Sequence, residues 1–149
     1  MSSAEVARRC ADEMFVKDRA TRELGIAVEV NDAGSASARM EVTERMINGL
    51  GVCHGGYIFT LADTAFAFAC NGYGQATFAS GASIQFVRSA RLGDALLAEA
   101  SEQHRGRSSG TYDVTVTNQE GKLVALFRGQ SRAIGAPGTP VVPAELGHL

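Results

Sequence analysis

Charged side chains are almost missing from the middle of this 149-residue chain. Between Met46 and Val87, a window of 42 residues, the only Asp, Glu, Lys or Arg is Asp63. Because charged residues make up 20% of the sequence, about eight of them would be expected in that window. A buried core explains why the others are missing. A carboxylate kept on a buried segment costs on the order of several kcal/mol unless it is paired, so Asp63 is a candidate functional residue.

Other absences narrow the class of protein. The formal net charge is −2 and no strongly basic face is evident, which argues against nucleic acid as a partner. The three cysteines form no CxxC pair, which argues against a disulfide framework and favours a reducing, cytoplasmic location. No His, Cys, Asp or Glu cluster has metal-ligand spacing, so we expect no metal.

We expect neither a secretory signal peptide nor a membrane span in this sequence. The first residues carry charges where a signal peptide needs an apolar run. The stretch from Tyr57 to Cys70 is apolar but only 14 residues long, which suits a buried helix better than a membrane span. All three prolines lie in the last 13 residues. We therefore expect one domain over residues 1–134 and a flexible tail over 135–149.

Two helices are predicted by local pattern. Ser2 and Glu5 form a capping box, and an i, i+4 apolar stripe follows, which predicts an amphipathic helix over about 3–17. The central stretch opens with Gly55-Gly56 and stays apolar to residue 70, which predicts a second helix over about 55–70. Asn71 and the glycines after it are expected to end that helix.

Six segments alternate between apolar and polar residues in the manner of strands. They are residues 26–30, 36–42, 80–88, 95–102, 111–117 and 123–129. The first two predict a hairpin, and short turns between the last four predict an antiparallel meander. A helix that is apolar nearly all round needs cover on most sides. We therefore expect an α+β fold in which a curved antiparallel sheet of about six strands wraps the long central helix.

The start of the central helix and its single acid have complementary chemistry. Free N–H groups at a helix N-terminus attract negative charge, and glycine lets a substrate approach the backbone closely. A carbonyl placed there would be polarised, while the Asp63 carboxylate could activate a water or attack directly. Gly55 and Asp63 are eight residues apart, about 12 Å along a helix, which is too far for one carbonyl to bridge. If both act on one bond, they come from two chains of a symmetric dimer whose central helices lie antiparallel.

At this point the residues resemble a known family. His54-Gly55-Gly56 opening a helix, with Asp63 eight residues after the first glycine, is similar to the hotdog-fold thioesterases. The closest likeness is to the phenylacetic-acid degradation thioesterase group, over roughly residues 12–134. That likeness implies a homodimer, commonly paired into a homotetramer, that hydrolyses acyl-CoA thioesters without a metal or other cofactor. Aryl-acetyl-CoA esters, especially ring-hydroxylated ones, are the implied substrates, and coenzyme A is part of the substrate.

The resemblance also implies roles for single residues. Asp63 becomes the general base or nucleophile, Gly55 the donor to the thioester carbonyl, and Asn48 a polar helper. His54 completes the candidate catalytic set and is expected to shape the glycine turn rather than to move protons. Ala67 stands where a related group has a helpful hydroxyl, so a relay from Asp63 is not expected here. The predicted site is completed by possible substrate contacts, namely Gly56, Phe66, Ala67 and, for the coenzyme A phosphates, Arg88, Arg105, Arg107 and Ser108.

Plainer readings stand beside these roles. Asp63 could be a satisfied buried carboxylate, His54 could shape the glycine turn, and Asn48 could be only a turn former. A nucleophilic Cys53-His54 pair is disfavoured because adjacent side chains point apart. Two other functions remain open, an acyl-thioester hydratase or dehydratase that relies on His54, and a non-catalytic acyl-CoA-binding module.

Overall fold

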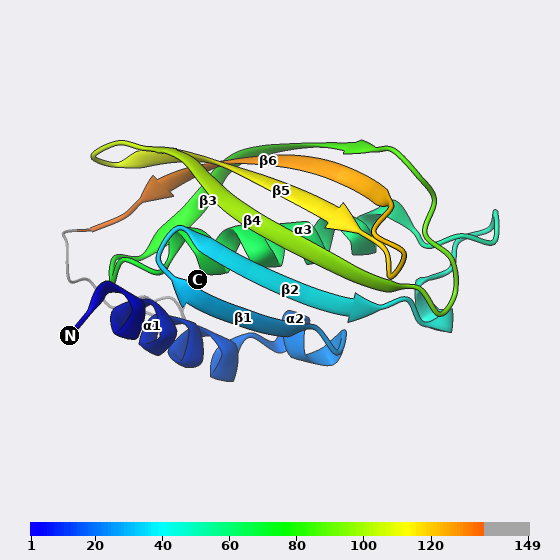
Figure 1. Cartoon of the computed structure of the whole chain (residues 1–149), viewed down its shortest axis with the longest axis horizontal. Coiled ribbons are helices and arrows are strands. Elements are labelled where there is room, and N and C mark those ends of the chain that lie inside the picture. The colour runs from blue at the N-terminus through cyan, green and yellow to red at the C-terminus, as the bar shows by residue number, and fades with distance from the viewer. Residues whose placement is uncertain (136–149) are drawn as a thin grey trace.

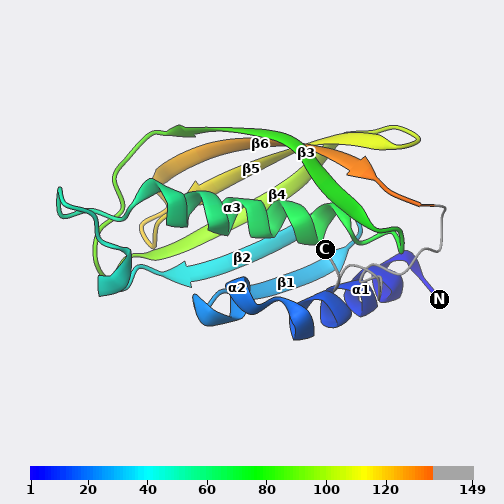
Figure 2. The same ribbon diagram turned by 180° about the vertical axis from the view of Figure 1, so that it is seen from behind.

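The computed structural model describes residues 1–135, and it consists of one six-stranded sheet with a long helix on its concave face (Figures 1 and 2). In chain order the elements are α1 (Ser3–Lys17), α2 (Arg19–Glu23), β1 (Ala27–Asp32), β2 (Ser35–Glu41), a 3-10 turn η1 (Glu44–Met46), α3 (Gly55–Cys70), β3 (Thr77–Phe86), β4 (Ala95–Arg105), β5 (Ser109–Thr117) and β6 (Leu123–Ala133). The tail predicted over 135–149 lies outside the described residues except for Gly135.

The order of strands corrects one prediction. The sheet runs β1-β2-β4-β5-β6-β3, and all its pairs are antiparallel. β4, β5 and β6 form the expected meander, but β3 does not pair with β4. It lies beside β6 at the far edge, with Ile84 opposite Phe127. The prediction of a four-strand meander was wrong because pairing partners are chosen by the packing of the whole sheet, not by the turn that follows a strand.

Small side chains let α3 lie close to the sheet. The helix faces it with Ala62, Ala65 and Ala69, which are fully buried. Opposite them β2 contributes Ala36 and Ala38, and larger residues fill the space on either side. Those larger buried residues include Leu61, Phe66 and Phe68 of α3 with Leu96, Tyr112, Val114, Val116 and Phe127 of the strands. The helix expected to need cover on most sides is therefore wrapped as predicted.

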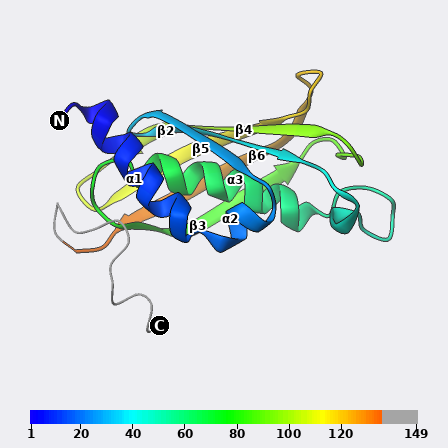
Figure 3. The same cartoon turned by 90° about the horizontal axis from the view of Figure 1, so that it is seen from below.

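The N-terminal region lies along the β1 side of this core (Figure 3). The Ser2 side chain accepts a hydrogen bond from the Glu5 N–H at 3.1 Å, which completes the expected capping box of α1. The sequence did not predict α2, which follows after Asp18 and is only five residues long. No helix within residues 1–135 has the length and apolar character needed to cross a membrane.

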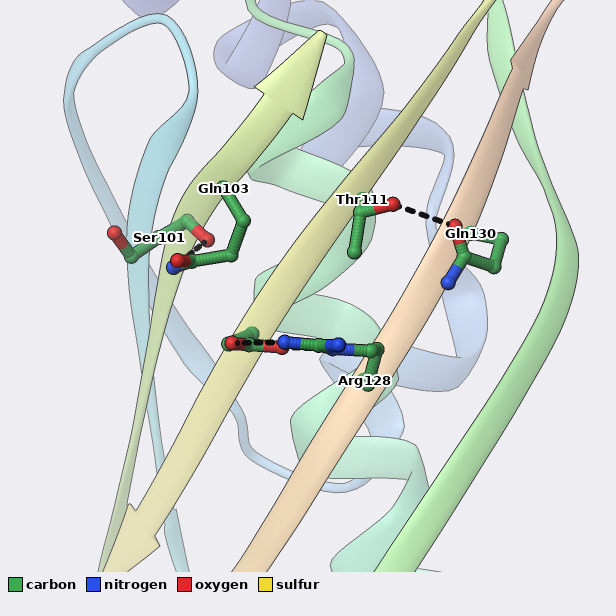
Figure 4. Close-up of polar contacts among 6 residues, drawn as sticks. Ser101, Gln103, Thr111, Arg128 and Gln130 are labelled. Carbon is green, nitrogen blue, oxygen red and sulfur yellow. Dashed lines mark hydrogen bonds and ion pairs between the residues drawn. The ribbon is translucent and has the colours of Figure 1, made fainter.

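The two faces of the sheet differ in chemistry. The outer face of its middle strands carries paired polar side chains, including Arg128 with Asp113 and Thr111 with Gln130 (Figure 4). β3 differs again, because nearly all its side chains are exposed and only one of its edges is paired within the described residues. Phe78 and Phe86 of β3 and the adjoining Val87 are about half exposed. An unpaired, apolar strand edge of this kind favours association with another chain.

Candidate active site

A cavity of about 470 Å³ opens beside Asp63. One wall is a helical stripe of α3, in which Asp63, Phe66, Ala67 and Cys70 follow one another at i, i+3, i+4 and i+7. The start of β3 supplies a second wall through Thr77, Phe78 and Ala79, and Asn71 closes the C-terminal end of the helix. Residues from the end of α1 supply a third wall. The predicted contacts Phe66 and Ala67 therefore lie together with Asp63.

The Asp63 carboxylate is half-buried and has no hydrogen-bond or ion-pair partner among residues 1–135. Burial raises the pKa of its carboxyl group above the ordinary value, because the charged form loses hydration. A satisfied structural carboxylate would show the hydrogen bonds that are missing here. A raised pKa in a cavity is instead typical of an acid or base that acts on a ligand.

The predicted carbonyl-binding end of α3 is built as the sequence suggested. His54 is the N-cap, and its ring Nδ1 accepts a hydrogen bond from the Gly56 N–H at 3.1 Å. The Gly55 N–H is the first of the helix and has no acceptor among the described residues. A Cβ atom at Gly55 would come within 2.9 Å of the tip of the half-exposed Phe86 ring, so a larger residue here would push that ring aside. The N-terminal end of α3 therefore presents the Gly55 N–H as a free hydrogen-bond donor, and glycine has no side chain that could cover it.

The surroundings of His54 and Cys53 distinguish a structural role for His54 from a nucleophilic Cys53-His54 pair. Because Nδ1 accepts this hydrogen bond from the helix backbone, His54 serves as a cap of α3, which is the plainer reading given above. The neighbouring thiol of Cys53 is buried, and this burial, with a smaller effect from Asp94, raises its pKa to about 11. A thiol that stays protonated near neutral pH is a poor nucleophile, which disfavours the Cys53-His54 pair.

Asn48 holds the loop in front of α3. Its side-chain Oδ1 accepts hydrogen bonds from the backbone N–H groups of Leu50 at 2.9 Å and Val52 at 3.3 Å. Its backbone N–H also donates to the Val52 carbonyl at 2.8 Å. The turn-forming role of Asn48 is therefore present. Its side-chain Nδ2 makes no hydrogen bond within the described part of the chain and remains the only group on this side chain that could meet a substrate.

The candidate phosphate-binding residues fall at opposite ends of α3. Arg88 follows β3 near the N-terminal end of the helix, where the Cys53 N–H donates to the Ala90 carbonyl. Arg105, Arg107 and Ser108 belong to the β4–β5 hairpin and line a small cavity of about 20 Å³ with Cys70, at the C-terminal end. The Arg105 guanidinium also stacks on the Tyr73 ring, 3.6 Å from its centroid. Because a 16-residue helix is about 24 Å long, one chain does not gather these arginines around one ligand.

Of the residues that line the Asp63 cavity, sequence reasoning placed only Asp63, Phe66 and Ala67, and three of those it missed come from the N-terminal region. Met14, Lys17 and Asp18 come from the end of α1 and the cap of α2, about 45 positions before Asp63 along the chain. No local pattern relates them to α3, so no signal in the single sequence could have placed them there. Asn71 was predicted only as a helix end, although its place one turn after Ala67 put it on the same face.

Comparison with known proteins agrees with this fold. The family model described as the thioesterase superfamily matches residues 50–125. The chain therefore belongs to the thioesterase superfamily, and its sheet wrapped around α3 is the hotdog fold. It is 47% identical to the acyl-coenzyme A thioesterase PaaI of Escherichia coli over 125 residues, which are 84% of this chain and 89% of that protein.

Solved structures extend the likeness. The structure of Escherichia coli PaaI, from the phenylacetic acid degradation operon, has a TM-score of 0.89 and 45% identity, and the match covers 91% of this chain and 99% of that one. A Streptococcus mutans protein solved bound to acetyl-CoA has a TM-score of 0.71 and 33% identity, over 74% of this chain and 89% of that one. The chain is thus a thioester hydrolase by family.

Proposed function

We propose that this enzyme hydrolyses aryl-acetyl-CoA thioesters to the free acid and coenzyme A. The observation that carries the proposal is the unpartnered, desolvated carboxylate of Asp63 in a cavity of about 470 Å³. That volume lies within the usual range for small-molecule sites and suits one ring with its short linker. The likeness to an acyl-coenzyme A thioesterase of phenylacetic acid degradation supports the same substrate class.

The chemistry follows from the two groups on α3. The Asp63 carboxylate accepts a proton from a water molecule as the water oxygen attacks the thioester carbonyl carbon. The carbonyl oxygen becomes an oxyanion that accepts a hydrogen bond from the Gly55 N–H at a helix N-terminus. The intermediate then collapses, the carbon–sulfur bond breaks, and the leaving thiolate of coenzyme A takes up the proton held by Asp63. The products are a carboxylic acid and a thiol, with no group left on the enzyme.

The site is complete only in a homodimer. Gly55 and Asp63 lie on one straight helix, so the 12 Å estimate of their separation still applies. Pairing of two β3 edges about a two-fold axis would lay the two α3 helices side by side and antiparallel. Gly55 of the partner subunit would then lie near Asp63, and the same contact would occur twice. The exposed, singly paired β3 with its half-exposed phenylalanines supports this arrangement.

The same pairing would bring the candidate phosphate-binding residues of two chains close together. In antiparallel helices the C-terminal end of one lies beside the N-terminal end of the other. Arg88 of one chain would therefore approach the hairpin that carries Arg105, Arg107 and Ser108 on the partner, so that both could meet one coenzyme A. The Asn48 side chain would supply its free Nδ2 donor at the same end. Further pairing of dimers into a homotetramer and a cytoplasmic location remain predictions.

Release of free thiol from a panel of acyl-CoA esters tests the proposal. Wild-type protein should favour phenylacetyl-CoA and its ring-hydroxylated forms over acetyl-CoA and long-chain esters. Asp63→Asn should lower kcat by about 10²- to 10⁴-fold, the usual contribution of a general base, while substrate binding persists. His54→Ala serves as the comparison variant, because a cap should matter far less than the base. Unchanged turnover in Asp63→Asn would refute the assignment. Wild-type protein that releases no thiol but hydrates an enoyl-CoA ester, and loses that activity in His54→Ala, would favour a hydratase.

A further inference from the structure

The Asp63 cavity has one wall that neither the two-chain site nor the glycine turn accounts for. Met14 and Lys17, one turn apart on the last part of α1, line the cavity opposite the stripe of α3 that carries Asp63, Phe66 and Ala67. Asp18 lines it as well. An acyl group that reaches from the carboxylate into the cavity therefore ends against the C-terminal part of α1.

Hydrogen bonds join the end of α1, which forms this wall, to the short helix α2. Asp18 caps α2, since its carboxylate accepts hydrogen bonds from the Thr21 N–H at 3.0 Å and the Thr21 hydroxyl at 2.7 Å. The Thr21 hydroxyl lies 3.5 Å from that of Thr64, the residue next to Asp63, and both threonines are buried. Arg22 also donates to the Val16 carbonyl at 3.0 Å and so covers the open end of α1. Hydrogen bonds thus join the end of α1 to α2, and the contact between Thr21 and Thr64 packs α2 against the helix that carries Asp63.

The carboxylate of Asp18 is engaged by Thr21, which leaves Met14 and Lys17 to face an acyl group. Met14 is half-buried and packs against the core, whereas the ammonium of Lys17 has no ion-pair partner within 4.0 Å among residues 1–135. A cavity of about 150 Å³ already holds a benzene ring, so the 470 Å³ left open beside Met14 accommodates one ring with its linker. Methionine adapts its shape to its neighbours, so a change at this position alters the space left for the acyl group.

We propose that the end of α1, through Met14 and the aliphatic stem of Lys17, is the specificity-determining wall of the acyl cavity and limits the acyl group to a single ring. This inference rests on the proposed thioesterase function and extends it to residues outside the central helix. A bulkier residue at position 14 shortens the cavity, and a smaller one lengthens it. The acyl group accepted by the enzyme therefore changes while the chemical step does not.

The test is kcat/KM for acetyl-CoA, phenylacetyl-CoA and 2-naphthylacetyl-CoA with matched variants. Met14→Phe should lower kcat/KM for phenylacetyl-CoA about tenfold relative to acetyl-CoA, and Met14→Ala should raise the ratio of naphthylacetyl to phenylacetyl ester about tenfold. Lys17→Ala should shift that ratio in the same direction, whereas Lys17→Met, which keeps an apolar stem, should not. Val16→Ala is the control, because Val16 is 69% exposed on the same helix and does not line this cavity.

Two results would overturn the proposal: acyl profiles of both Met14 variants that parallel the wild type within about twofold, or a shift of equal size in Val16→Ala. Thermal unfolding of each variant identifies any that fails to fold, and the remaining Met14 or Lys17 variant then decides. If wild-type protein releases no thiol from any ester, the proposed function is wrong, but the proposal about the wall is still open to a separate test. The wall is then tested by titration with phenylacetate, whose Kd should rise at least about fivefold in Met14→Phe and stay unchanged in Val16→Ala.

Discussion

The chemistry of Asp63 is set by what surrounds its carboxylate. A phenylalanine, an alanine and a cysteine share its face of α3, and no described residue donates a hydrogen bond to it. The charged form is therefore held at a cost, which a hydrogen bond from a bound water can relieve. A carboxylate in this state binds a proton more readily than an exposed aspartate, which is what a general base requires.

The acid side of the pH profile should report this carboxylate. Desolvation raises the pKa of Asp63, and only the ionised form can accept a proton from water. As pH falls through the raised pKa, kcat/KM should fall, with its midpoint above the value of about 3.9 for an ordinary aspartate. The residual activity of Asp63→Asn should lack this limb. A limb of the same midpoint in that variant would assign the titration to another group.

Gly129 of β6 should tolerate no larger residue, because the ring beside it is buried and cannot move aside. A Cβ atom at Gly129 would lie 2.8 Å from Cδ1 and Cε1 of Phe66, a ring that also packs edge-on against Tyr112. Gly129→Ala should thus destabilise the fold by about 1–3 kcal/mol, as crowding of a packed core does. Chemical denaturation measures the change. Gly49→Ala is the matched control, since its Cβ would meet nothing within 4 Å, and an equal loss there would point to backbone effects instead.

Sequence reasoning recovered the part of the site that is local in the chain. The charge gap singled out Asp63, and helical spacing brought Phe66 and Ala67 to it. The cap of His54 on the Gly56 N–H is equally local. Met14 and Lys17 could not be predicted, because their position near α3 depends on how the whole of α1 packs. No local pattern in a single sequence gives the distance between two helices.

At the scale of elements, local features were again predicted and long-range pairings were not. α1 and α3 occupy the residues expected from capping and apolar periodicity, because a helix satisfies its hydrogen bonds within itself. A strand needs a partner, so its neighbour depends on the rest of the sheet. β3 was accordingly placed beside the wrong strand, and its true start at Thr77 was missed by three residues. The five-residue α2 is too short to show a period.

The paired polar side chains on the outer face of the sheet should add little to its stability. The Arg128 guanidinium makes two hydrogen bonds to Asp113, at 2.6 and 2.9 Å, and lowers the pKa of that carboxyl group (Figure 4). Both side chains are more than a third exposed, so Arg128→Met should cost less than about 1 kcal/mol. Urea denaturation at low and high salt measures the loss.

The pH dependence of that loss has a defined sign. Because Arg128 lowers the pKa of Asp113 in the folded state, the pair stabilises the protein above the pKa of an unfolded aspartate. The contribution disappears as pH falls through the folded pKa, so wild type and Arg128→Met should converge in acid. Thr111→Val, which removes a 2.7 Å hydrogen bond to Gln130 on the same face, is the uncharged comparison and should show no such convergence.

At the scale of the whole molecule, each proposed active site takes one half from each of two chains. A subunit that lacks the base and a subunit that lacks the carbonyl-binding end are then defective in different halves. Mixing Asp63→Asn with Gly55→Val subunits should therefore restore activity that neither variant has. Half of the dimers are hybrids and one site in each is intact, so recovery should approach about one quarter of wild type.

The hybrid experiment needs subunits that exchange, which refolding from denaturant or co-expression provides. Sedimentation of each variant should give a dimer or a larger even assembly. Activity that stays at the sum of the two separate variants would show that one chain holds a whole site. A fully active monomer would have the same meaning.

The position of β3 also sets the order in which the molecule can be completed during synthesis. β3 leaves the ribosome before β4, β5 and β6, yet its partner within the chain is β6, the last of them. Phe86 lies opposite Ala125 and Phe78 opposite Arg132, so neither phenylalanine has a neighbouring strand within the chain before β6 emerges. Such long-range pairing slows folding, because a large loop closes before the contact forms. The strand proposed to join two subunits therefore gains its neighbour within the chain only after β6, the last strand among residues 1–135, has been made, and assembly of the dimer waits on that strand.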